Sequence, residues 1–231
     1  MTGFLASVAT LDEMALARAA GADIVDLKNP AEGALGAWAL ADLRAAVALW
    51  RGWGEDAPLL SATIGDRPMV PETVRAAADA VAETGVPLVK LGVFRGGDAG
   101  ACFEALRPLG RRVKLIAVFF ADQGVDRDLV EHAASAGFHG AMIDTADKAA
   151  GGLRRHIHTP ALGRFVREAK ALGLLTGLAG SLRLADVDDL AELGPDYLGF
   201  RGALCDGGRT GAFSTEAAQS LRAALNAKRA A

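Results

Sequence analysis

The chain has few cysteines, no long apolar run and no block of basic residues. Its two cysteines, Cys102 and Cys205, form no CxxC pair, which argues against a disulfide scaffold and against a zinc site. The longest apolar runs are about six residues, far below the length of a membrane span. Asp12 and Glu13 directly follow the first apolar segment, so we predict no signal peptide. With a net charge of −3, the composition predicts a cytoplasmic protein that binds neither membrane nor nucleic acid.

Lysine is also scarce, because only six of the 25 basic residues are lysine and the others are arginine. Arginine does not deprotonate in proteins, whereas a buried lysine can become a neutral nucleophile or base. The positions of the lysines therefore carry more information than their number.

Short apolar runs alternate with helical stretches rich in Ala, Leu, Arg and Glu over the whole chain. The predicted strands are Phe4–Val8, Ile24–Lys28, Leu59–Ile64, Leu88–Val93, Val113–Phe119, Ala141–Asp144, Leu175–Ala179 and Tyr197–Phe200. The predicted helices are Leu11–Ala20, Leu40–Trp50, Pro71–Glu83, Gly100–Leu106, Asp126–Ala136, Leu162–Leu172, Leu184–Leu193 and Thr215–Lys228. Eight βα units without a linker predict one domain over residues 1–231, a single (β/α)8 TIM barrel. A doubly wound open sheet is the alternative, although no GxGxxG follows the first strand.

Charged residues fall on the predicted inner face of three even-numbered strands. Side chains alternate along a strand, so Asp26 and Lys28 share one face of the second strand, and Lys90 lies on the inner face of the fourth. The sixth strand ends at Asp144, and Lys148 follows four residues later. A structural layer of salt bridges is one interpretation of this cluster. The sharper hypothesis is an imine-forming lysine with acid–base partners, because neighbouring cations lower one another's pKa and burying charge is costly.

A second signal follows the last two strands. Gly180-Ser181 ends the seventh strand and Arg201-Gly202 ends the eighth, which are the places where TIM barrels commonly bind phosphate. We therefore predict phosphate binding at Gly180, Ser181, Arg201 and Gly202.

Other residue types predict no further chemistry. His156 and His158 lie in a polar loop without a third ligand, so we predict surface histidines and no metal. The tryptophans Trp38, Trp50 and Trp53 are expected to pack locally or to meet another subunit, which would make the protein a homo-oligomer.

The chain resembles the (5-formylfuran-3-yl)methyl phosphate synthase family, also called 4-(hydroxymethyl)-2-furancarboxaldehyde-phosphate synthase. The resemblance spans almost the whole chain in the right order. It rests on DIVDLKNP at 23–30, EGALGA at 32–37, SATIGD at 61–66, VKLG at 89–92, DTADK at 144–148, LAGS at 178–181 and RGALC at 201–205.

The resemblance implies a lyase that condenses two glyceraldehyde 3-phosphates into the furan precursor of methanofuran or methylofuran, without a cofactor. It implies that Lys28 forms a Schiff base and that Lys90 transfers protons. Asp26 would tune the amine, while Asp144 and Lys148 would orient hydroxyls or stabilise charge. Two alternatives stay open: another Schiff-base aldolase or isomerase acting on phosphosugars, and a non-catalytic barrel that binds a phosphometabolite.

Overall fold

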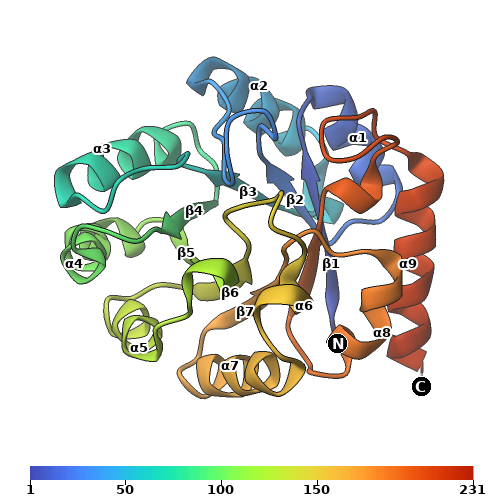
Figure 1. The fold of residues 1–231 in the computed structure, drawn as a ribbon. Helices are drawn as coiled ribbons and strands as arrows, with labels where there is room; N and C mark the ends of the chain where they lie inside the picture. Colours follow the sequence, from blue (N-terminus) through green and yellow to red (C-terminus); the bar gives the residue numbers. More distant parts are fainter. Residues whose placement is uncertain (231) are drawn as a thin grey trace.

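The computed structural model describes residues 1–230 and shows a closed barrel of eight parallel strands, each paired with its neighbours in chain order (Figure 1). The predicted (β/α)8 TIM barrel is therefore confirmed. The single domain predicted for residues 1–231 includes residue 231, which lies outside the described residues. The strands are β1 (Gly3–Val8), β2 (Ile24–Leu27), β3 (Leu59–Thr63), β4 (Leu88–Val93), β5 (Lys114–Phe120), β6 (Gly140–Asp144), β7 (Leu175–Leu178) and β8 (Tyr197–Phe200).

Helices cover the outside of the barrel, and the last helix, α9, packs against α1 and α8 (Figure 1). They are α1 (Leu11–Ala19), α2 (Leu40–Arg51), α3 (Pro71–Ala82), α4 (Ala99–Gly110), α5 (Arg127–Ser135), α6 (Leu153–His156), α7 (Thr159–Ala171), α8 (Val187–Ala191) and α9 (Thr215–Ala230). Within residues 1–230, no helix combines the length and the apolar character that crossing a membrane requires.

The helices α4, α7 and α8 differ from their predicted bounds by more than two residues, and α7 begins at Thr159, three residues before the predicted start. The helix predicted to end at Leu106 continues through Pro108, because a proline in the last turn removes one hydrogen bond while Leu109 beyond it stays buried in the core. The short α6 was not predicted. The element predicted as Leu184–Leu193 divides into a 3-10 turn, Leu184–Asp186, and the five-residue α8.

Two apolar layers hold the barrel together. The larger lies between the strands and the helices, and the smaller fills the barrel interior with side chains such as Leu5, Ile24 and Leu88. Two residues farther along these strands, the inward positions change to Ser7, Asp26 and Lys90, all buried. Because parallel strands are buried on both faces, polar residues at these positions must find partners inside the barrel. The apolar filling of the barrel interior thus gives way to a polar cluster at the C-terminal ends of the strands.

Candidate active site

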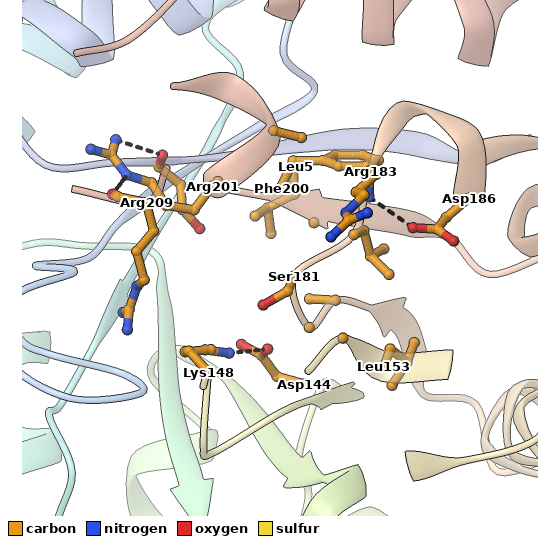
Figure 2. Close-up of a pocket in the computed structure, with 18 of the residues that line it drawn as sticks. Leu5, Asp144, Lys148, Leu153, Ser181, Arg183, Asp186, Phe200, Arg201 and Arg209 are labelled. Atoms are coloured by element: carbon orange, nitrogen blue, oxygen red, sulfur yellow. Dashed lines mark hydrogen bonds and ion pairs between the residues drawn. The ribbon is translucent and has the colours of Figure 1, made fainter. Parts of the chain in front are cut away.

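A cavity of about 580 Å³ opens at the C-terminal ends of the strands (Figure 2). All the residues predicted as catalytic or phosphate-binding line it: Asp26, Lys28, Lys90, Asp144, Lys148, Gly180, Ser181, Arg201 and Gly202. The fold therefore brings together side chains from β2, β4 and β6 with the turns that follow β7 and β8.

Asp26 and Lys90 form a fully buried ion pair at the centre of the cluster. The Nζ atom of Lys90 lies 2.8 Å from Oδ1 of Asp26. The same carboxylate accepts hydrogen bonds from the hydroxyls of Ser7, at 3.0 Å, and Ser61, at 2.7 Å. Burial opposes ionisation of Asp26, but the charges of Lys90 and Lys28 hold its pKa below the ordinary value. Asp26 is therefore an anion that fixes the position of the Lys90 ammonium.

Asp144 holds the second ion pair and contacts two lysines. Its Oδ1 atom accepts a hydrogen bond from Lys148 Nζ at 2.5 Å, and Lys28 Nζ lies 3.7 Å from Oδ2. The backbone N–H of Thr145 also donates to Oδ1, at 2.7 Å. Although burial raises the pKa of Asp144, Lys148 and Lys28 together lower it further than burial raises it. The carboxylate therefore stays ionised between the two lysines.

Lys28 differs from the other two lysines of the cluster. It is buried, yet its ammonium makes no hydrogen bond with any residue in the described part of the chain, and only the 3.7 Å contact with Asp144 partners it. Lys90 and Lys148 each donate a hydrogen bond to an aspartate. An amine without hydrogen-bonded partners has its lone pair accessible once it loses a proton, which is what a nucleophile requires.

Burial favours the neutral amine in Lys90 and Lys148. It lowers the pKa of Lys90 more than the opposite charge of Asp26 raises it, and the nearby Lys28 lowers it further. The pKa of Lys148 is lowered for the same reason, against the opposing charge of Asp144. Two amines that lose protons more readily than an exposed lysine thus lie next to Lys28, as acid–base chemistry near neutral pH requires.

The turn after β7 supplies backbone donors. Gly180 has a φ of +113°, and Ser181 has a φ of +50°, which is uncommon for a residue with a side chain. The carbonyl of Gly180 accepts from Leu153 N–H of α6, at 2.8 Å, which holds the turn. The backbone N–H groups of Gly180, Ser181 and Leu182 make no hydrogen bond to another described residue, so they are free to bind an anion.

Arg201 lies in the cavity wall, but its guanidinium is already fully engaged. It donates to Arg209 O at 2.7 Å, Ser7 O at 3.3 Å, Gly211 O at 3.5 Å and both carboxylate oxygens of Glu13. An arginine has five donor N–H groups, so no donor is left for a phosphate. The side chain of Arg201 therefore supports the site, and phosphate binding through the backbone N–H groups of this turn stays a prediction.

Two supporting carboxylates were missed in the sequence. Glu13 pairs with Arg201 and also accepts from Ala9 N–H at 2.7 Å. Its only sequence signal is the Thr10-x-x-Glu13 spacing of a helix capping box, and the Thr10 hydroxyl does accept from Glu13 N–H at 3.1 Å.

The second missed carboxylate, Asp122, comes from the turn after β5. It accepts from the N–H groups of Ala146 and Asp147, at 2.8 and 2.7 Å, and so holds the turn that carries Lys148. These two bonds lower the pKa of Asp122 against the opposing effect of burial. No sequence spacing indicates this contact.

The remaining candidates stay outside the cavity. Burial raises the pKa of the Cys102 thiol to about 11, which makes it unreactive, and Cys205 is partly buried with a raised pKa. The indole of Trp50 donates to Pro58 O at 2.8 Å, as local packing predicts. No group of three or more His, Cys, Asp or Glu residues within positions 1–230 could hold a metal ion.

Comparison with known proteins shows that the chain matches one enzyme family. The sequence pattern of the 4-HFC-P synthase family matches residues 4–222. A Methylorubrum extorquens protein provisionally named (5-formylfuran-3-yl)methyl phosphate synthase is 43% identical over 201 residues, covering 87% of this chain and 81% of the relative. The (5-formylfuran-3-yl)methyl phosphate synthase of Methanobrevibacter smithii is 36% identical over 203 residues, covering 81% and 83%.

Among solved structures, the phosphoribosyl anthranilate isomerase of Thermus thermophilus superposes with a TM-score of 0.67 at 19% identity. The superposition covers 99% of this chain and 100% of the isomerase. At that identity the likeness shows the barrel fold alone.

Proposed function

The chain belongs to the 4-HFC-P synthase family and is an enzyme with that synthase activity, and we propose the following chemistry for it. Two molecules of glyceraldehyde 3-phosphate condense to (5-formylfuran-3-yl)methyl phosphate, with release of one phosphate and two waters. The product would serve as the furan precursor of a methanofuran-type carrier. The whole chain acts as one catalytic domain.

The observation that carries the proposal is the difference between the three lysines. The side-chain amine of Lys28 makes no hydrogen bond with any described residue, whereas aspartates hold Lys90 and Lys148 by hydrogen bonds. The neutral amine of Lys28 attacks the carbonyl of one triose, and loss of water gives the imine. Asp144, 3.7 Å away, stabilises the positive charge that the imine nitrogen carries when protonated.

Proton transfer is assigned to Lys90. With its pKa lowered by burial, Lys90 accepts the proton from the carbon next to the imine and leaves an enamine. The enamine carbon adds to the aldehyde of the second triose. Loss of phosphate, ring closure and dehydration then give the aromatic ring, and hydrolysis of the imine releases the product and restores the free amine of Lys28. Lys148 donates hydrogen bonds to hydroxyl groups during these steps, held by Asp144.

Phosphate binding is assigned to the turns after β7 and β8. The free N–H groups of Gly180 and Ser181, together with the backbone of Gly202, bind a triose phosphate as backbone donors. No step of the proposal needs a metal or an organic cofactor, because the imine withdraws the electrons.

The test combines product analysis with trapping. Purified protein given glyceraldehyde 3-phosphate should release phosphate while a furan ultraviolet band appears, and mass spectrometry should identify the furan aldehyde phosphate. Borohydride added during turnover should fix a triose-derived mass on Lys28. An aldolase or isomerase would convert the triose without releasing phosphate, and a pure binding protein would do neither; each outcome would refute the proposal.

A further inference from the structure

We propose that Arg209 binds a substrate phosphate at the mouth of the cavity, and that the Glu13–Arg201 ion pair holds Arg209 in place. This inference rests on the proposed function only in taking the substrate to be a triose phosphate. It makes Arg209 a specificity-determining residue for the phosphorylated substrate.

The free donors of Arg209 are the first argument. It lines the cavity, and its Nη2 atom donates to the carbonyl of Gly33 at 2.9 Å. That is the only hydrogen bond that its side chain makes in the described part of the chain, so four of its five N–H donors are unused. Arg201, by contrast, has none to spare.

The location of the Arg209 side chain is the second argument. In Figure 2 it extends from the Arg201 end of the cavity toward Lys148. Its charge interacts with Asp144 and Asp66, and burial lowers its pKa, although a guanidinium keeps its proton in proteins. A phosphate bound near Lys28 and Lys148 would therefore meet this guanidinium.

A bound phosphate would readily replace the Gly33 carbonyl as the partner of the Arg209 guanidinium. A neutral carbonyl is a weaker partner for a guanidinium than a phosphate, which accepts two parallel charge-assisted hydrogen bonds. Gly33 belongs to the loop between β2 and α2, so the hydrogen bond from Arg209 joins two loops across the mouth.

Contacts from Arg201 and within the loop itself hold Arg209 in place, although the loop lies at the surface. The loop folds back on itself, because Cys205 and Phe213 form an antiparallel bridge and Asp206 N–H donates to Ala212 O at 2.9 Å. Arg201 then donates to the backbone carbonyl of Arg209 at 2.7 Å. Glu13 neutralises Arg201 and keeps this donor in place. Arg201 and Glu13 are accordingly positioning residues.

The experiment measures the binding of glycerol 3-phosphate by calorimetry. This probe carries the phosphate but no carbonyl, so it cannot react with Lys28. Arg209→Gln should weaken its binding about 10–100-fold, the effect of losing hydrogen bonds between charged groups. Arg67→Gln is the matched control, because Arg67 is an exposed arginine outside the cavity and its loss changes the net charge equally.

If Arg201 holds Arg209 in place, the effects of substituting the two residues on glycerol 3-phosphate binding should not be additive. In an Arg201→Met background, Arg209→Gln should weaken glycerol 3-phosphate binding by clearly less than it does in the wild type. A purely structural role of Arg201 would instead lower stability and leave the effect of Arg209→Gln unchanged. That result would overturn the positioning role.

Three results would overturn the role of Arg209. They are unchanged affinity in Arg209→Gln, an equal loss in Arg67→Gln, and no binding of glycerol 3-phosphate by the wild type. The failure of the proposed function looks different, since a wild type that forms no furan from glyceraldehyde 3-phosphate can still show the predicted binding loss in Arg209→Gln. Conversely, normal furan formation with unchanged affinity in Arg209→Gln refutes this inference alone.

Discussion

Replacing Lys90 with methionine separates the structural and the catalytic roles of the central ion pair. Methionine has nearly the same length as lysine, so the change removes the charge 2.8 Å from Asp26 without opening a large cavity. Asp26 then keeps the hydroxyls of Ser7 and Ser61 and the more distant charge of Lys28.

The size of the destabilisation follows from the burial of the pair. Removing one partner of a buried ion pair costs about 3–5 kcal/mol, because the other charge stays buried without compensation. Because two hydroxyls still bind Asp26, we expect the free energy of unfolding to fall by about 3 kcal/mol at pH 7, the lower end of this range. For a chain of this length, that corresponds to a fall in Tm of about 6–12 °C.

The stabilities of the wild type and of Lys90→Met should change with pH in opposite directions. In the wild type the pKa of Asp26 is below the ordinary 3.8, so its stabilising contribution is complete above that pH and is lost as the pH falls below it. In Lys90→Met, burial is the main remaining influence and raises the pKa of Asp26, so the variant loses stability as the pH rises above about 4. The difference in stability between wild type and variant should therefore narrow as the pH falls from about 7 to about 4.

Urea unfolding across this pH range measures the effect. The double variant Asp26→Asn/Lys90→Met, which has no charge at either position, should be more stable at pH 7 than Lys90→Met alone. A loss of stability that does not change with pH, or a double variant no more stable than the single one, would refute the account of the buried pair.

The same variant tests the assignment of proton transfer. Lys90→Met should still form the borohydride-trapped adduct on Lys28, because imine formation needs only one neutral amine. Furan formation should fall about 10²–10⁴-fold, the usual contribution of a general acid–base group. Loss of the trapped adduct in a folded variant would show that Lys90 is needed before proton transfer.

Three further predictions concern other parts of the site. Lys28→Arg should fold with an unchanged Tm yet form no adduct and no furan, since a guanidinium keeps the charge but cannot make the imine; turnover within tenfold of the wild type would contradict this. Asp122→Asn should leave one N–H of the Lys148 turn without an acceptor, because the amide has a single oxygen; stability should fall by about 1–3 kcal/mol and furan formation should slow. Asp98→Asn, at the start of α4 and outside the cavity, should keep normal turnover. Gly36→Ala should raise KM and lower Tm, because its Cβ would lie 2.3 Å from the carbonyl oxygen of Asn29; a variant with wild-type KM and Tm would show that this loop can shift freely.

The sequence by itself determined the barrel and the central cluster. The alternation of apolar runs with helical stretches predicts eight βα units, and the period of two along a strand puts Asp26 and Lys28 on one face. These signals are local, because they depend only on residues within one strand or one turn. For the same reason nine of the residues that line the cavity, from Asp26 to Gly202, could be named before any contact was known.

Only the tertiary structure decided which charges pair. Arg201 and Glu13 are 188 positions apart in the chain and meet because β8 closes the barrel against β1. Arg209 reaches Gly33 across 176 positions for the same reason. A charged side chain in a sequence shows what it can bind but not which partner lies nearest. Because the closed barrel brings Glu13 against Arg201, the guanidinium of Arg201 is bound by protein partners, whereas the Arg209 side chain makes only its hydrogen bond to Gly33 among the described residues.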